Sequence, residues 1–271
     1  MTVVEYKGYW PNIRTGNSQM TIKLLKNNQE YNLLDSKYKI IWSYANPSHF
    51  HFSDKPIIWA RNQICAIGSE NKKEIFYLLS ILDSKIINKI LISNLKTETE
   101  KDFLVSTSSI KQYVRIPKIT KENQFIKDEI IKRTEEMLSL EEKTLSDIVD
   151  FSGIMLQKFD DVEIESSNLI LKHNGNKTKL KIKSDVKLIS ETIQKELKEE
   201  LKLENKKINL ADLKNLPVID FDKQKKLKDY IDDLVLALYF NVPVNEIGPS
   251  KSDGIKNLCS KNKYYQIVNN L

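Results

Sequence analysis

Arginine is the rarest cation of this chain and the one best suited to specific recognition. Four arginines stand among a large excess of lysines: Arg14, Arg61, Arg115 and Arg133. A guanidinium can bind the edge of guanine through two hydrogen bonds, whereas a lysine mainly contacts phosphate. Arg14 follows Trp10-Pro11, and Arg61 lies beside Trp59 between two β-prone runs. Arg14, Trp59 and Arg61 are therefore candidate base contacts, with a solvated charge or surface ion pair as the alternative for each arginine.

A second set of cations is suited to phosphate. Arg115 and Lys118 bracket Ile116-Pro117, just before a predicted helix. Lys179, Lys181 and Lys183 alternate along a predicted strand, so they share one exposed face of it. The alternative is again an ordinary solvated face. The complete set of candidate DNA-binding residues is Arg14, Trp59, Arg61, Arg115, Lys118, Lys179, Lys181 and Lys183.

Residues for catalysis or metal binding are harder to find. His49 and His51 flank Phe50 at strand spacing and could bind a metal together, or form a surface pair. Glu204-Asn205-Lys206 and Glu141-Glu142-Lys143 have the acidic-x-lysine spacing of some nuclease sites, which a chain this charged also produces by chance. We therefore predict no catalytic, metal-binding or cofactor-binding residues.

Composition places the chain among ordinary globular proteins. It has 271 residues, of which 40% are hydrophobic and 30% charged, and this length allows two domains. The net charge of +6 permits a nucleic-acid partner without demanding one. Cys65 and Cys259 lack metal-type spacing, which indicates a reducing compartment. No apolar run reaches bilayer length, so we expect a cytoplasmic protein without a membrane partner.

A segment that occurs twice, a hundred positions apart, organises the second half of the chain. Ile116-Pro117-Lys118-Ile119 and Leu216-Pro217-Val218-Ile219 each precede an amphipathic run. A residue before proline is extended, so each copy predicts an extended segment and then a helix. The apolar faces comprise Ile126, Ile130, Ile131, Met137 and Leu138 in the first helix, and Leu227, Tyr230, Ile231, Leu234, Val235 and Leu238 in the second. We expect the two helices to pack together antiparallel; two unrelated surface helices are the alternative.

The remaining elements predict an α+β fold. Residues 1–115 form a mixed α/β domain, with a hairpin or two adjacent strands around Arg61-Asn62, a buried helix over 74–91 and a β-prone run over 103–109. Residues 116–271 form a helical support region with a β insertion at about 160–184. There Asn174-Gly175, between alternating runs, predicts a hairpin. A charged helix is expected over 185–203.

Three short motifs carry a resemblance to a known family. They are Leu78-Leu79-Ser80-Ile81-Leu82-Asp83-Ser84-Lys85, then Ile116-Pro117-Lys118-Ile119 before a helix, then Ile231-Asp232-Asp233-Leu234-Val235-Leu236-Ala237-Leu238-Tyr239 followed by Glu246-Ile247. In this order, over roughly residues 40 to 250, they resemble the C-terminal half of bacterial type IIG restriction-modification enzymes. That half is the target-recognition domain of a DNA adenine methyltransferase. Type I restriction specificity subunits are also similar, with a Pro-led segment and a long helix after each recognition domain.

The chain departs from that family where the catalytic half would be. None of its seven glycines forms a G-x-G pair to cradle S-adenosylmethionine. The nearest match to the family's Asn-Pro-Pro-aromatic motif is Asn46-Pro47-Ser48-His49-Phe50, in which Ser48 replaces the second proline; an ordinary turn is the alternative.

The resemblance therefore implies sequence-specific DNA recognition by a chain that is not an enzyme itself. Its partners would be double-stranded DNA and a DNA methyltransferase module or subunit, which would bind S-adenosylmethionine. The alternatives are a protein-interaction subunit that does not bind DNA, or a divergent methyltransferase or nuclease.

Overall fold

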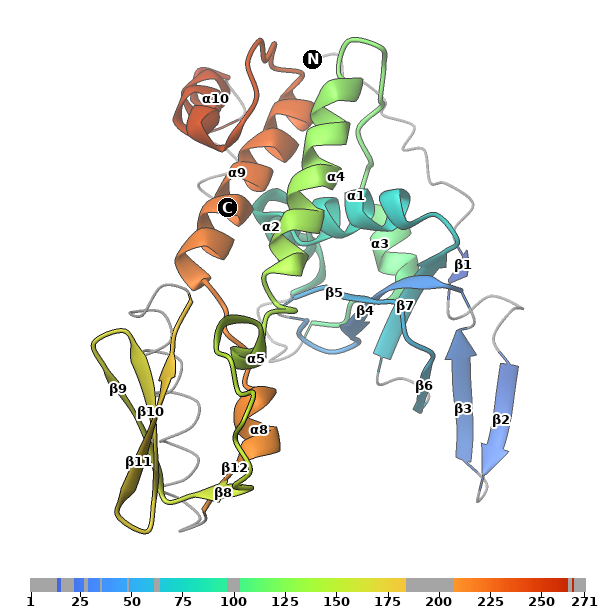
Figure 1. Ribbon diagram of the computed structural model, residues 1–271. Helices are drawn as coiled ribbons and strands as arrows, with labels where there is room; N and C mark the ends of the chain where they lie inside the picture. The colour runs from blue at the N-terminus through green and yellow to red at the C-terminus, as the bar shows by residue number, and fades with distance from the viewer. Residues whose placement is uncertain are drawn as a thin grey trace, which may run out of the picture. The chain divides into compact units, whose positions relative to one another are not determined.

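The chain has the α+β structure that the sequence predicts, and it divides into two compact units (Figure 1). The computed structural model describes residues 14–15, 22–26, 29–34, 36–47, 49–60, 64–96, 103–183, 207–262 and 265, with the backbone alone for those between 14 and 34 and for 58–60. Met1–Glu135 and Leu227–Leu271 form one unit, called the terminal unit below. Glu136–Lys226 forms the other, called the inserted unit.

Two antiparallel sheets lie in the terminal unit. The first has the order β1-β7-β4-β5, comprising β1 (Arg14–Thr15), β7 (Ile64–Ser69), β4 (Tyr38–Ser43) and β5 (His51–Ser53). The second has the order β2-β3-β6, comprising β2 (Ile22–Lys26), β3 (Gln29–Leu34) and β6 (Ile57–Ala60). Because β6 and β7 belong to different sheets, the expected hairpin or strand pair around Arg61-Asn62 is wrong. β7 is a buried central strand that pairs with β1 on one edge and with β4 on the other. Neither edge is therefore left for β6.

The apolar segment after β7 forms two helices rather than the single one expected over 74–91. They are α1 (Lys72–Leu82) and α2 (Lys85–Leu95). The break follows from Ser84, whose Oγ accepts a hydrogen bond from the amide of Ile87 and caps α2. α1 is buried from Ile75 to Leu82 and packs against β4, β5 and β7, which confirms the expected burial.

The chain between α2 and α4 is helical where a strand was expected. Leu104 forms an isolated β-bridge with Ala45, and α3 (Thr107–Tyr113) begins three residues later. Ser106 Oγ accepts a hydrogen bond from the amide of Ser109 at 3.0 Å. The β run expected over 103–109 is therefore wrong for most of its length, because a serine cap satisfies the first turn of a helix.

The two Pro-led helices, α4 (Gln124–Ser139) and α9 (Phe221–Phe240), pack side by side and antiparallel (Figure 1). Tyr230 Oη donates to Glu129 Oε1 at 3.4 Å, and Lys223 Nζ lies 3.2 Å from Glu136 Oε1. Residue numbers thus fall along α9 where they rise along α4, so the two helices are antiparallel. This confirms that the two Pro-led helices pack together as expected. The apolar faces of both helices are buried, apart from Met137 and Leu138, which are only partly buried. Their buried members are Ile126, Ile130 and Ile131 on α4 and Leu227, Tyr230, Ile231, Leu234, Val235 and Leu238 on α9.

Contacts between α4 and α1 explain why residues 116–135 belong to the terminal unit, although the sequence grouped them with the support region. Thr134 Oγ1 hydrogen-bonds Ser80 Oγ of α1, and Lys72 Nζ lies 3.3 Å from Glu135 Oε1. Ile116-Pro117 and Leu216-Pro217 consequently lie in different units.

The inserted unit contains the predicted hairpin. Its main sheet has the order β11-β10-β9, comprising β9 (Asp161–Glu165), β10 (Asn168–His173) and β11 (Asn176–Lys181). Asn174 and Gly175 have φ of 46° and 77°, the left-handed pair that a two-residue primed turn requires. The helix expected over 185–203 lies outside the described residues.

Short elements complete this unit around one apolar core. They are α5 (Leu145–Ile148), β8 (Lys158–Phe159), β12 (Ile208–Asn209) and α8 (Leu210–Lys214), with β12 paired to β8. The sheet contributes Val162, Leu169 and Leu171 to the core, and the short helices contribute Leu145, Leu210 and Leu213.

After α9 the described residues form a 3-10 turn, η2 (Pro249–Lys251), and α10 (Ser252–Ser260). Ser252 Oγ donates to Asp233 Oδ2 of α9 at 2.7 Å. Within the described part of the chain, no helix combines the length and the apolar character that crossing a membrane requires.

The helix pair makes a stability prediction. Ile131→Ala and Leu234→Ala, in side chains that are 8% and 0% exposed, should each lower the free energy of unfolding by about 2 to 5 kcal/mol. The cost of the double variant should depart from the sum, because both sites belong to one packed interface. Urea unfolding measures all three. Lys132→Ala, on the exposed face of α4, is the control, and single costs below about 0.5 kcal/mol would contradict the packing.

Candidate functional site

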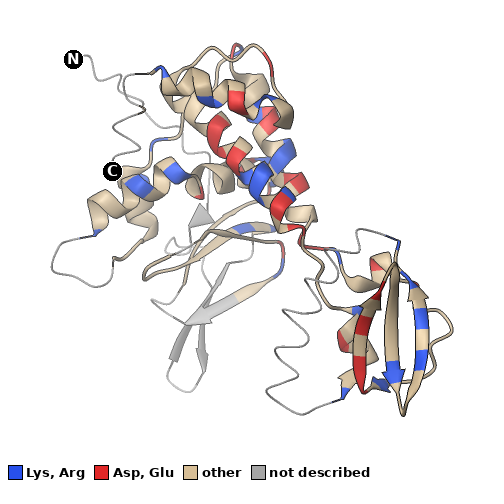
Figure 2. Cartoon of the chain, turned by 90° about the vertical axis from the view of Figure 1, so that its left-hand side faces the viewer, with Lys and Arg blue, Asp and Glu red and all other residues tan. Residues whose placement is uncertain are grey.

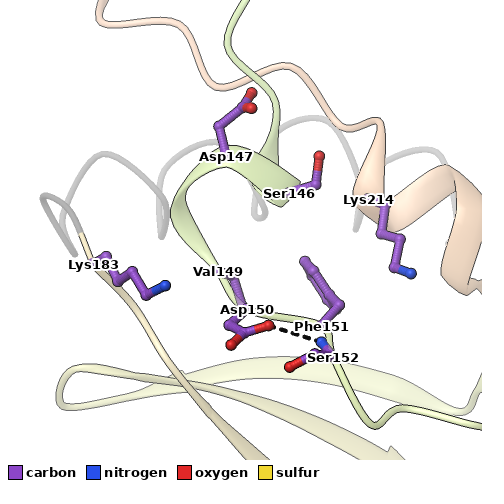
Figure 3. A pocket seen from close by; sticks show the side chains of 8 residues that line it. All are labelled: Ser146, Asp147, Val149, Asp150, Phe151, Ser152, Lys183 and Lys214. Carbon is purple, nitrogen blue, oxygen red and sulfur yellow. Dashed lines mark hydrogen bonds between the residues drawn. The ribbon is translucent and has the colours of Figure 1, made fainter.

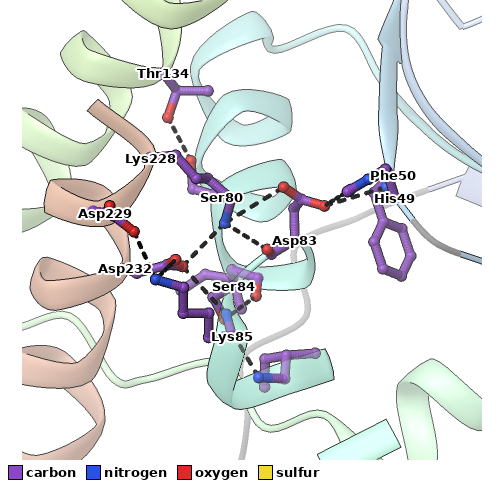
Figure 4. A network of polar contacts seen from close by, with 12 residues as sticks. His49, Phe50, Ser80, Asp83, Ser84, Lys85, Thr134, Lys228, Asp229 and Asp232 are labelled. Atoms are coloured by element: carbon purple, nitrogen blue, oxygen red, sulfur yellow. Dashed lines mark hydrogen bonds and ion pairs between the residues drawn. The ribbon is translucent and has the colours of Figure 1, made fainter. Parts of the chain in front are cut away.

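Two of the three motifs that carry the resemblance meet in space, although they lie about 150 positions apart in the sequence. Lys228 Nζ, one turn before the motif on α9, donates to Asp83 O at 2.6 Å and Asp232 Oδ1 at 3.0 Å (Figure 4). Lys85 Nζ lies 2.6 Å from Asp229 Oδ1 and 3.6 Å from Asp232 Oδ2. A network of ion pairs therefore joins the α1–α2 turn to α9.

Asp232 is the buried centre of this network, at 3% exposure. Its Oδ1 also accepts a hydrogen bond from the amide of Lys85 at 3.2 Å, at the positive end of α2. Burial raises the pKa of Asp232, while the charges of Lys228 and Lys85 act in the opposite direction. Asp83 extends the network to the lead-in of β5, where His49 Nδ1 lies 3.6 Å from its Oδ1. Because each lysine is already held by a carboxylate, the arrangement is suited to joining elements rather than to catalysis.

Net positive charge is confined to the terminal unit. The inserted unit has 17 lysines and no arginine against 18 acidic residues, which gives it a net charge of −1. Because the net charge of the whole chain is +6, the terminal unit has a net charge of +7. Electrostatic attraction to a phosphate backbone therefore belongs to the terminal unit.

One segment of that unit, residues 103–121, concentrates the charge. It contains four cations and no acidic residue. The cations, all exposed, are Lys111, Arg115, Lys118 and Lys121. None of them forms an ion pair with a carboxylate of the described residues. This stretch, called the basic segment below, runs through α3 and the loop that leads into α4 (Figure 1).

Arg115 has a local role as well. Its Nη1 donates to the carbonyls of Lys111 at 3.1 Å and Gln112 at 2.7 Å, so it caps the C-terminus of α3. The cap orients the guanidinium and leaves its other nitrogens without a hydrogen bond to any described residue. Arg115 and Lys118, both predicted phosphate contacts, thus lie on one exposed stretch.

The predicted base contacts are placed by their backbone alone or not at all. Arg14 belongs to β1 and pairs with Gly68 of β7. Trp59 belongs to β6 and pairs with Asn32 of β3. Arg61 lies outside the described residues, directly after β6. β1 and β6 are edge strands of their sheets among the described residues, so Arg14 and Trp59 belong to edge strands.

The lysine face predicted for the hairpin is largely neutralised. β9 carries a row of acids and β11 a row of lysines on either side of β10 (Figure 2). Lys177 and Lys179 lie 3.2 and 3.8 Å from Glu165, which is held on the opposite edge strand. Lys181 is exposed and makes no ion pair with the described residues. Lys183 lies beyond the strand, after Ile182 has bridged to Val149, and it is not part of that face.

Lys183 instead borders a hollow of about 450 Å³ in the inserted unit (Figure 3). The hydrogen bonds to Asp147 from Thr144, and to Asp150 from Ser152, lower the pKa of each carboxyl. Lys214 Nζ lies 5.8 Å from the centre of the Phe151 ring. These groups serve the local fold, and their polar atoms do not converge on one ligand.

The other residues considered for chemistry are placed in structural roles. The backbone amide of Asn46 donates to Phe103 O, and its side-chain oxygen accepts from the amide of Phe103, both at 2.9 Å, so Asn46 joins two segments that lie 57 positions apart in the sequence. His49 and His51 lie with ring centres 6.5 Å apart. Among the described residues, no group of three or more His, Cys, Asp or Glu side chains could hold a metal ion. Glu141 accepts from Gln224, while Glu204-Asn205-Lys206 lies outside the described residues.

Two residues absent from the predicted set bind the backbone of the basic segment at the predicted phosphate contacts, Arg115 and Lys118. Tyr239 Oη donates to Arg115 O at 2.7 Å, and Asn123 Nδ2 donates to Lys118 O at 3.1 Å. The sequence could have indicated a structural role for Asn123, because Asn is favoured just before a helix. The sequence could not have indicated the contact of Tyr239, because its partner is 124 positions away.

In comparisons with known proteins, no family model, no curated protein and no solved structure matches the chain.

The buried carboxylate makes a prediction about pH. Because the pKa of Asp232 is raised by folding, the native state holds its proton at pH values where the unfolded state has lost it. Wild type should therefore lose stability relative to Asp232→Asn as the pH rises from about 4, the unfolded value, through the folded pKa. Urea unfolding across this range measures the difference, and Asp253→Asn, an exposed site on α10, controls for net charge. A difference that stays constant, or grows with pH, would show that Lys228 and Lys85 outweigh burial.

Proposed function

We propose that this chain is a non-catalytic DNA target-recognition module that works with a DNA adenine methyltransferase. One observation carries the proposal: the basic segment presents exposed cations without carboxylate partners among the described residues. It belongs to the unit that carries the net positive charge of the chain. Cations already paired within a protein gain little from phosphate, whereas unpaired ones release counterions from DNA on binding. The resemblance of the three motifs supplies the partner class.

Within this proposal the two kinds of cation divide the work. Arg115 and Lys118, with Lys111 and Lys121, contact phosphates and set the orientation on the duplex. Arg14 of the edge strand β1 and Arg61, two residues after Trp59 in the sequence, read bases. The lysines of the hairpin contribute little, because the acidic row of β9 offsets them. The methyltransferase module supplies S-adenosylmethionine and the chemistry, and the cytoplasm is the compartment where such a partner and DNA meet.

The recognition step predicts how specificity responds to mutation. Arg61→Ala and Arg14→Ala should each cost about 1 to 3 kcal/mol on a selected site and little on scrambled duplex, because a base contact is lost. A competition assay between the two duplexes measures the ratio, with the methyltransferase partner supplied. An unchanged ratio in both variants would reject these base contacts. A wild type without preference, alone or with its partner, would reject target recognition and favour a protein-interaction subunit.

The phosphate contacts predict a response to salt. Lys118→Gln should weaken binding to every duplex alike and make the plot of log affinity against log salt shallower by about one. Lys179→Gln removes the same charge from the neutralised sheet of the inserted unit and should leave the slope unchanged. Titrations at a series of salt concentrations measure both. Equal effects of the two substitutions would show that net charge alone, rather than the basic segment, drives binding.

A further inference from the structure

We infer that Tyr239 and Asn123 are positioning residues for DNA binding, which hold the backbone of the basic segment so that Arg115 and Lys118 face the duplex together. The inference rests on the proposed function and gives a role to two residues that are not among the candidate DNA-binding residues of the sequence analysis. It depends on three features of residues 114–123: a tether from α9, a tether from the start of α4, and an alternation of buried and exposed side chains.

The first tether crosses from α9 to the end of α3. Tyr239 Oη donates to the carbonyl of Arg115 at 2.7 Å, the residue whose guanidinium caps α3. Burial raises the pKa of Tyr239, so its hydroxyl stays protonated and remains a donor at neutral pH. The backbone of Arg115 is thus held by Tyr239 of α9, and its side chain is held by two carbonyls of α3.

The second tether is the side chain of Asn123, which binds the loop at two points. Its Nδ2 donates to the carbonyl of Lys118 at 3.1 Å, and its Oδ1 accepts from the amide of Thr120 at 2.7 Å. One amide group therefore closes the loop over the residues between them. With Tyr239 at Arg115, both predicted phosphate contacts have their own carbonyl fixed by a side chain.

The alternation of burial decides which way the cations point. Val114 and Ile116 are 0% and 4% exposed, and Pro117 is buried next to them. Arg115 and Lys118 are exposed between and after these anchors. The apolar side chains hold the loop to the core, and the tethers limit its remaining freedom, so the two cations reach solvent in a fixed relation.

Such a loop binds with a smaller loss of entropy. Ordering a free loop on binding costs affinity, and holding it in the bound shape beforehand removes that cost. Tyr239 and Asn123 hydrogen-bond two carbonyls and one amide of the segment, so we expect their effect on DNA to pass through Arg115 and Lys118.

The decisive experiment compares two tyrosine-to-phenylalanine variants of the full chain on a random-sequence duplex. Tyr239→Phe removes the tether, and we expect affinity to fall roughly 2- to 10-fold, the range of one lost hydrogen bond. The slope of log affinity against log salt should become shallower by up to about one, as a phosphate contact is lost. Tyr77→Phe is the matched control, because its buried hydroxyl has no hydrogen-bond partner among the described residues. It should leave affinity and slope unchanged.

Hydrogen exchange separates positioning from stability. In Tyr239→Phe and in Asn123→Ala, the amides of residues 115, 116, 118 and 119 should exchange faster without DNA, while those of β4 and β7 keep their wild-type rates. Affinity and slope equal to wild type in Tyr239→Phe would overturn the inference and leave the proposed function standing. A fall in affinity with an unchanged slope, or faster exchange throughout the unit, would also overturn it, since loss of stability then explains the effect. A wild type that binds no duplex at low salt overturns both.

Discussion

The pairing of Asp232 with the α1–α2 turn is the constraint on which the terminal unit depends. The chain leaves this unit after residue 135 and returns at residue 227. Helix α9 must therefore pack against helices that lie far earlier in the sequence. Asp232 accepts from the amide of Lys85 and lies between the ammonium groups of Lys228 and Lys85. Removing one partner of a buried ion pair costs about 3 to 5 kcal/mol, whereas the complete pair adds little over an apolar contact. The network therefore selects one register of α9 more than it adds stability.

That register determines what the rest of α9 reaches. Tyr239 follows Asp232 by seven residues, two turns or about 10 Å along the same face of the helix. Once Asp232 is docked at the start of α2, Tyr239 is carried to the end of α3, where it meets the carbonyl of Arg115. Tyr230, on the same helix, bonds both Glu129 of α4 and the amide of Gly248. One helix thus joins α2, the end of α3, α4 and the C-terminal turn.

Charge is organised differently in the two units. In the inserted unit, lysines and acids face each other across β10, and the pairs offset one another within the sheet. Charged side chains along exposed strands also discourage pairing with other chains, which explains their presence without a ligand. In the terminal unit, the cations of residues 103–121 have no such partners among the described residues. A count of lysines cannot distinguish these two situations, because it ignores which strand lies opposite.

Patterns that depend on neighbours in the sequence predicted the structure well. Asn174-Gly175 predicts its turn because only residues tolerant of positive φ fit there. The stripes of α4 and α9 predict a packed pair because an apolar face needs a partner. Serines at 84 and 106 were the missed local signals, since each caps a helix that propensity alone merged with its neighbour or read as a strand.

What the sequence determined by itself was therefore local: the hairpin, the buried helices, the two Pro-led helices and the scarcity of arginine. Only the tertiary structure decided that β6 and β7 belong to different sheets, that Lys177 and Lys179 are paired with Glu165, and that Tyr239 holds Arg115. Each of these depends on residues brought together from distant parts of the chain. Periodicity and propensity describe the few residues on either side of a position, and they carry no information about which remote carbonyl, carboxylate or strand edge will lie against it.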